Sequence, residues 1–183
     1  MVPMALTPEL LTDRLRLRET RAGDFAGCAE LWGDEAVVRY IGGTPSTPTE
    51  AWARMLRFPG LWALLGYGYW TVEDRETGAF AGQVGLADFK RDLQPAIDGI
   101  PEAGWVISPA FHGRGIASEA MAAVLAWADR ELPQQRTCCL IDPENGASIR
   151  VAEKLGYAGC RPASLGGAAS LLYFRERPGG TRP

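Results

Sequence analysis

The sequence contains a single histidine, His112, among its 183 residues. A Ser-His-Asp triad would have to use it, and no Gly-x-Ser-x-Gly nucleophile elbow is present. The four cysteines, at positions 28, 138, 139 and 160, show no Cys-x-x-Cys spacing. We therefore expect reduced, structural thiols and no metal site, and these absences argue against a triad hydrolase and against a metalloenzyme.

Long apolar runs and an excess of basic charge are also missing. No run of 18 apolar residues could form a transmembrane helix, and the start, MVPMALTPELL, lacks the features of a signal peptide. A net charge of −3 disfavours a general nucleic-acid binder. We expect a cytoplasmic protein with neither a membrane nor a nucleic acid as partner. Its length and 46% apolar content predict one domain over residues 1–183, with a core at about 10–176 and a frayed tail at 177–183.

The most informative segment is residues 104–118, GWVISPAFHGRGIAS. An apolar, strand-like run ends at Pro109, and a loop of small residues opens into an amphipathic helix. A helix N-terminus carries unpaired backbone N–H groups and the positive end of the helix dipole, so it suits an anion. Gly113 and Gly115 allow backbone amides to approach that anion closely. The segment therefore predicts a ligand that carries phosphate.

Several glycine-rich designs compete for this loop. A P-loop requires a lysine after the last glycine, and none follows Gly115. A dinucleotide fingerprint fits poorly, because Ser118 stands where the third glycine belongs. Two alternatives remain open at this point. One is a structural glycine turn before a helix. The other is an acyl-CoA loop of the form Gln/Arg-x-x-Gly-x-Gly/Ala, which residues 112–117 match except at His112.

A second segment, residues 145–157, favours the acyl-CoA loop. It resembles Asn-x-x-Ser-x-x-(hydrophobic)-x-x-x-Leu-Gly-(aromatic), the second cofactor motif of the GNAT N-acetyltransferases, and lies about 30 residues after the first motif. The stretches 11–18 and 118–120 are similar to the RimJ/RimL-type branch, which includes ribosomal-protein N-terminal acetyltransferases. By this resemblance the chain is identified as a member of the GNAT superfamily.

Hydrophobic periodicity and turn residues predict a mixed α/β (α+β) order, βααβββαβαββ. Strands are expected at 14–18, 69–74, 80–89, 103–108, 136–141, 157–160 and 170–174. Helices are expected at 24–31, 47–57, 114–131 and 145–155, with the segment 58–60 breaking or kinking the second helix. The resemblance implies a GNAT fold, a mostly antiparallel sheet of about seven strands with the cofactor between splayed fourth and fifth strands.

The resemblance also implies acetyl-CoA as co-substrate, with no metal. Its pyrophosphate is expected on the backbone amides of Gly113, Arg114, Gly115, Ala117 and Ser118, with His112 beside them. The pantetheine arm is expected to pair with the backbone of Trp105, Val106 and Ile107. Asn145 has two open interpretations, a contact to the pantetheine and an N-cap of its helix.

Acetyl transfer from a thioester requires a deprotonated amine and protonation of the leaving thiolate. The resemblance places the Ser148 hydroxyl near the thioester sulfur as the acid, with water as the alternative. Many relatives have a tyrosine four residues further along, where this chain has Ala152. For the base we name Glu102, which shares a strand face with Gly104 and Val106 by period-two counting and would act through water. An exposed glutamate without a catalytic role is the alternative.

The sequence therefore predicts an acetyl-CoA-dependent N-acetyltransferase that acts on a primary amine by direct attack in a ternary complex, since no cysteine lies at a motif position. The favoured acceptor is a peptide or protein N-terminal amine, because its pKa of about 8 is far below that of a lysine. A small molecule such as a polyamine or an aminoglycoside is the second acceptor. A CoA-binding sensor or interaction module without catalysis is the alternative that Ala152 keeps open. The protein is expected to be a monomer or a homodimer.

Overall fold

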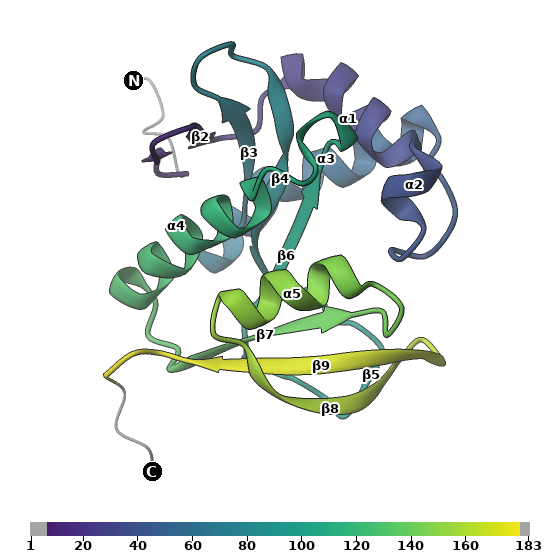
Figure 1. Ribbon diagram of the computed structural model, residues 1–183, viewed down its shortest axis with the longest axis vertical. Helices are drawn as coiled ribbons and strands as arrows, with labels where there is room; N and C mark the ends of the chain where they lie inside the picture. The colour runs from purple at the N-terminus through teal and green to yellow at the C-terminus, as the bar shows by residue number, and fades with distance from the viewer. Residues whose placement is uncertain (1–6, 180–183) are drawn as a thin grey trace.

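The computed structural model describes residues 7–179, whose strands form one nine-stranded sheet (Figure 1). The spatial order is β1-β2-β3-β4-β6-β7-β9-β8-β5, and every neighbouring pair is antiparallel except β6 and β7. The strands are β1 (Leu10–Leu11), β2 (Leu15–Arg18), β3 (Tyr69–Asp74), β4 (Phe80–Ala87), β5 (Leu93–Gln94), β6 (Glu102–Ile107), β7 (Arg136–Ile141), β8 (Ala158–Leu165) and β9 (Ala168–Glu176).

Five α-helices cover this sheet in the described part of the chain. They are α1 (Phe25–Gly33), α2 (Glu35–Val38), α3 (Pro48–Leu65), α4 (Ile116–Glu131) and α5 (Gly146–Lys154). The predicted start of α3 is confirmed, because the Thr47 hydroxyl accepts a hydrogen bond from the Glu50 amide and the Glu50 carboxylate accepts one from the Thr47 amide. The mixed α/β fold predicted from the sequence is therefore confirmed.

Alternate residues of β6 face two different layers of helices. Ala103 and Ile107 pack into a core that includes residues of α4 and α5. Val106 points the other way and packs with residues of α1 and α3. Figure 1 shows α4 and α5 on the near side of the sheet and α3 partly behind it. Strand β6 thus contributes to both layers of helices, although the C-terminal part of α3 reaches α4 through Trp62 and Trp127.

Three tryptophans fix α4 against the sheet. Trp62, Trp70 and Trp127 pack edge to face, with ring centroids 4.7–5.3 Å apart. The indole N–H groups of Trp62 and Trp70 donate to the backbone oxygens of Tyr69 and Pro8, so their polar atoms are satisfied.

The parallel neighbours β6 and β7 pair only at Glu102 and Cys138. Beyond that point the two strands diverge, and residues 103–107 pair with β4 on one side only. The predicted splay between the fourth and fifth strands of the sequence analysis is therefore present as the separation of β6 from β7. It leaves one backbone edge of β6 without a neighbouring strand.

The predicted end of the second long helix was wrong. Helix α3 continues through Pro59 to Leu65 and ends at Gly66, whose φ is +73°. Phe58 and Trp62, on either side of the proline, are 3% and 4% exposed. Their burial offsets the backbone hydrogen bond that the proline cannot donate.

The short elements β1, β5 and α2 were not predicted, because two to four residues carry no periodicity. Strands β8 and β9 are longer than predicted, since Gly166 and Gly167, both at positive φ, make a tight turn that lets the pairing continue. The predicted fraying at residue 177 was wrong, because the Arg177 amide donates to the Gln135 carbonyl oxygen at 2.7 Å.

Residues 180–183 of the predicted tail, and residues 1–6 on which the signal-peptide interpretation depended, lie outside the described residues. Within residues 7–179, no helix has the length and apolar character needed to cross a bilayer.

Candidate active site

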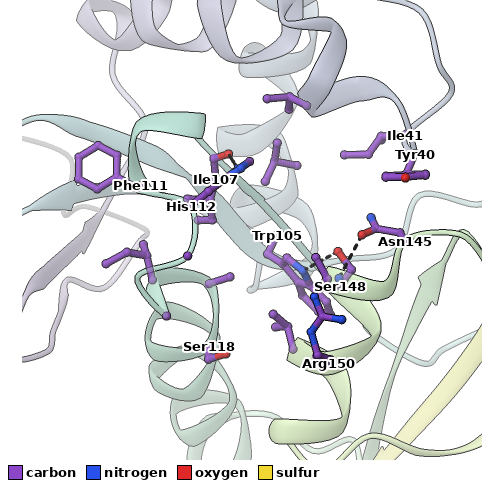
Figure 2. Close-up of a pocket in the computed structure, with 18 of the residues that line it drawn as sticks. Tyr40, Ile41, Trp105, Ile107, Phe111, His112, Ser118, Asn145, Ser148 and Arg150 are labelled. Atoms are coloured by element: carbon purple, nitrogen blue, oxygen red, sulfur yellow. Dashed lines mark hydrogen bonds between the residues drawn. The ribbon is translucent and has the colours of Figure 1, made fainter.

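A cavity of about 700 Å³ lies beside the free edge of β6 (Figure 2). Its walls come from the end of β6, the loop before α4 and the first turn of α4, one side of α5 along its length, and α2 with the turn that follows it. Most of the sequence-predicted cofactor residues line it: Trp105, Val106, Ile107, His112, Gly113, Gly115, Ala117, Ser118, Asn145 and Ser148. Arg114 is not among the lining residues, and its guanidinium lies over the Phe111 ring at 5.2 Å.

The glycine loop has the backbone geometry that the sequence predicted. Gly113 and Gly115 have φ angles of +71° and +75°, a region in which residues with a Cβ are strained. Helix α4 begins at Gly115 without a side-chain cap, whereas α3 and α5 are capped by Thr47 and Asn145. The first N–H groups of α4 therefore remain available to an anion in the cavity.

An acidic residue in the first turn of α4 is neutralised by the neighbouring β1–β2 turn. The Glu119 carboxylate accepts hydrogen bonds from the Thr12 hydroxyl at 2.5 Å and from Nε of Arg14 at 2.7 Å. Although partial burial opposes the shift, these bonds hold the pKa of Glu119 below its usual value. Arg14 also donates to the Arg114 carbonyl oxygen at 2.9 Å. The carboxylate is thus compensated, and the loop is held from outside the cavity.

His112 connects the loop to β6. Its Nε2 lies 2.8 Å from the Ile107 carbonyl oxygen. Because a carbonyl oxygen only accepts, this nitrogen carries the proton in that contact. The structure therefore gives His112 a positioning contact at the end of the strand.

One polar contact caps the start of α5, and a second joins α5 to β6 (Figure 2). The Asn145 side-chain oxygen accepts from the Ser148 amide at 3.1 Å, which is the N-cap interpretation of Asn145. The indole N–H of Trp105 donates to Oγ of Ser148 at 3.3 Å. Since an indole nitrogen can only donate, the hydroxyl proton of Ser148 is left for another acceptor.

Several lining residues were missed by the sequence analysis. Arg150 and Lys154 lie four residues apart on α5 and both line the cavity. Their i, i+4 spacing was a usable sequence signal for one basic helix face. Tyr40 and Ile41, which follow α2, also line the cavity and carry no motif. Ala152 is fully buried in the core.

Glu102 lies apart from this group. Its side chain is 8% exposed, and both carboxylate oxygens accept from Nε of Arg91, at 3.0 and 2.7 Å. Glu102 lies where β6 and β7 still pair, opposite Cys138, and it does not line the large cavity. The structure thus brings Ser148 together with the cofactor residues but does not bring Glu102 to them.

The buried thiols are poor nucleophiles. Burial, together with the charge of Glu102, raises the pKa of Cys138 to about 12, and burial also raises the pKa of Cys139 and of Cys28. These thiols stay protonated at neutral pH. Cys160 is exposed and does not line the cavity. Among residues 7–179, no cluster of three His, Cys, Asp or Glu side chains could hold a metal ion.

The parallel strands β6 and β7 diverge, and the uncapped start of α4 lies beside the gap. This arrangement suits a long ligand that carries phosphate at one end. A model of the family described as the acetyltransferase (GNAT) domain matches residues 14–158. The chain belongs to this family, and it is an acetyltransferase. The GNAT resemblance seen in the sequence is thereby confirmed.

Two relatives illustrate the similarity. The Bacillus subtilis protein YkkB is 35% identical over 152 residues, which cover 81% of this chain and 84% of YkkB. An acetyltransferase from Agrobacterium tumefaciens superposes with a TM-score of 0.79 at 27% identity, over 92% of this chain and 94% of that one.

More distant structures share the fold alone. RimL, a ribosomal L7/L12 alpha-N-protein acetyltransferase solved with coenzyme A, has a TM-score of 0.72 at 18% identity, over 91% of this chain and 96% of that one. A spermidine N-acetyltransferase of Vibrio cholerae, solved with CoA and spermine, has a TM-score of 0.71 at 17% identity, over 91% and 97% of the two chains.

Proposed function

We propose that this chain transfers the acetyl group of acetyl-CoA to a primary amine, with the N-terminal amine of a peptide or protein as the favoured acceptor. The observation that carries the proposal is the large cavity between the free edge of β6 and the uncapped start of α4. Acetyl-CoA supplies the thioester whose acetyl group is transferred. The test is amine-dependent release of the coenzyme A thiol.

The lining residues suit acetyl-CoA. The amides of the loop 113–118 suit the pyrophosphate, and Arg150 and Lys154 add positive charge on the opposite wall. The free edge at 105–107 offers backbone donors and acceptors to the amides of the pantetheine arm. The side-chain NH₂ of Asn145, whose oxygen caps α5, offers a further donor to that arm.

Replacing Asn145 with Ala separates binding from capping. The lost cap should lower the free energy of unfolding by about 1 kcal/mol. The lost amide should raise the Michaelis constant for acetyl-CoA roughly 3- to 10-fold with little change in turnover. Thr47→Ala is the matched control, because it removes the cap of α3 away from the cavity. Thermal melts and acetyl-CoA saturation curves measure both effects. An Asn145→Ala enzyme that behaves like Thr47→Ala would reduce Asn145 to a cap.

We propose Ser148 as the acid that donates a proton to the leaving thiolate sulfur. Its hydroxyl accepts from Trp105, so the oxygen is held and its proton is free to be donated. Trp105 acts as a positioning residue in this proposal. Ala152 offers no hydroxyl, so no tyrosine replaces Ser148 in this role.

Glu102 remains the proposed base, with one condition that the geometry adds. Both oxygens of Glu102 accept from Nε of Arg91, so Glu102 must exchange Arg91 for water or acceptor before it takes a proton. Glu102→Gln should then lower turnover by ~10²-fold and flatten the acidic limb of the pH–rate profile. Arg91→Gln breaks the same ion pair and keeps the carboxylate, so the acidic limb of the pH–rate profile should persist in this variant. If both variants lose the same activity with unchanged pH profiles, Glu102 serves only as the partner of Arg91.

A small-molecule acceptor is the second enzymatic proposal, because the fold neighbours include a spermidine enzyme as well as RimL. A catalytically inactive CoA-binding module is the third. It predicts tight acetyl-CoA binding without amine-dependent thiol release.

A further inference from the structure

Three arginines line a second cavity, of about 320 Å³, away from the one that contains Ser148. Arg54 and Arg57 project from α3, and Arg91 lies in the segment before β5. Apolar walls come from Phe89 and Leu165.

Arg54 is held in an unusual state. Its guanidinium stacks on the Trp32 ring at 3.8 Å, and its Nε atom is buried with no hydrogen-bond partner in the described structure. Burial lowers the pKa of Arg54, and the nearby charge of Arg57 adds to the effect. Within residues 7–179, neither arginine forms an ion pair. A partly desolvated cation without a counterion is costly, so an anion that enters this cavity would be stabilised.

The one carboxylate in the described lining of the cavity does not cancel this charge. Glu102 pairs with Arg91 at 2.7 Å, and Asp92, which also lines the cavity, is exposed and unpaired among the described residues. Of the residues that line the cavity, three carry guanidinium groups and one, Asp92, carries a carboxylate. Glu50, which also interacts with Arg54, is not among the lining residues. Such a cavity favours an anion and repels a polyamine.

One buried cluster reaches toward both the arginine cavity and the reaction cavity. Trp32, on whose ring the Arg54 guanidinium stacks, packs in the same buried cluster as Val106 of β6. Val106 also lines the large cavity. An acceptor that spans both cavities would present its amine near β6 while another part of it reaches Arg54 and Arg57.

We infer that the cavity of Arg54, Arg57 and Arg91 binds a carboxylate of the acceptor. The inference rests on the proposed function and deepens it, since it selects acidic amines over polyamines. The carboxylate could belong to an acidic side chain near a peptide N-terminus or to a free amino acid, and the experiment separates these two sources.

The experiment compares matched acceptors. A peptide that begins Ser-Glu-Glu is compared with one that begins Ser-Gln-Gln, both with amidated C-termini, and free serine with serinamide, by thiol release with acetyl-CoA. We expect kcat/KM for the acidic peptide to exceed that for its amide twin by ~10-fold, the scale of one charge-assisted hydrogen bond. A preference confined to the free amino acids would assign the carboxylate to a small acceptor.

Variants assign the preference to the arginines. Two variants are used, Arg57→Gln at an exposed position and the double variant Arg54→Gln with Arg57→Gln. In both, the ratio of kcat/KM for the acidic peptide to kcat/KM for its amide twin should fall toward one, with acetyl-CoA affinity unchanged. Arg54→Lys keeps the charge and should restore part of the ratio. Arg130→Gln, an exposed position on α4, is the control that should leave it intact. Equal kcat/KM for all twins in the unmodified enzyme, or a ratio that survives the double variant, would overturn the inference.

A binding measurement keeps the inference independent of turnover. The N-acetylated Ser-Glu-Glu peptide cannot be acetylated again at its N-terminus, and calorimetry with the CoA-loaded protein should detect it only when Arg54 and Arg57 are present. Arginine-dependent binding without turnover of any amine would support the site and defeat the proposed function. Turnover of neutral amines, with no charge preference and no binding of this peptide, would support the proposed function and overturn the arginine site.

Discussion

Gly115→Val is expected to weaken acetyl-CoA binding by ~100-fold, equivalent to about two charge-assisted hydrogen bonds. Gly115 has a φ of +75°, which a β-branched residue adopts only with strain. A side chain there would rotate the loop toward ordinary backbone angles and turn its amides away from the pyrophosphate. The fold itself has room for the change, since the nearest atom to an added Cβ is Nη2 of Arg14 at 3.8 Å. Isothermal calorimetry with acetyl-CoA measures the loss.

Gly78→Val is the matched control for this variant. Gly78 has a φ of +71° in the β3–β4 turn, with nothing within 4 Å of an added Cβ. It therefore carries the same backbone strain far from the loop, and its acetyl-CoA affinity should be unchanged. Normal affinity in a folded Gly115→Val protein would remove the phosphate-loop assignment.

Ser148→Ala is expected to lower turnover by ~10²-fold, the usual contribution of a positioned acid. Acetyl-CoA affinity should change little, because the cap from Asn145 uses the Ser148 backbone amide and not its hydroxyl. A thioester with a more acidic leaving thiol should lose less rate, since that thiolate departs without help. Stopped-flow thiol release with the two donors measures the difference.

Trp105→Phe tests the positioning part of the same proposal. It removes the indole donor, which lies 3.3 Å from Oγ of Ser148, and keeps an aromatic ring at the edge of the cavity. Turnover should fall by less than in Ser148→Ala, and the double variant should be no slower than Ser148→Ala alone. Equal loss with both thioesters in Ser148→Ala would contradict the acid role and favour water.

The parts of the site that the sequence could predict are those that depend on local backbone chemistry. Gly113 and Gly115 signalled a loop with positive φ, Thr47 signalled a helix start, and the residue pattern at 103–108 signalled the strand that precedes the loop. Each of these follows from which conformations a short segment can adopt, so no tertiary contact was needed.

The remaining features depend on contacts between distant segments. Pro59 lies inside a helix because Phe58 and Trp62 are buried against the sheet. The stacking of Arg54 on Trp32 joins α3 to α1, and the pairing of Glu102 with Arg91 joins β6 to a loop. No pattern within one segment encodes these pairings, which is why the environment of the proposed base could not be predicted.

The central claim is acetyl transfer to an amine, and the most direct measurement is the release of coenzyme A thiol over a panel of amines. The panel contains peptides with free N-termini, the same peptides with blocked N-termini and an internal lysine, polyamines and aminoglycosides. We predict thiol release that requires an amine, is fastest with free peptide N-termini, and coincides with acetylation of that amine by mass spectrometry. Acetyl-CoA that binds tightly but is released unchanged, with no thiol formed for any amine, would contradict the account and identify a CoA-binding module.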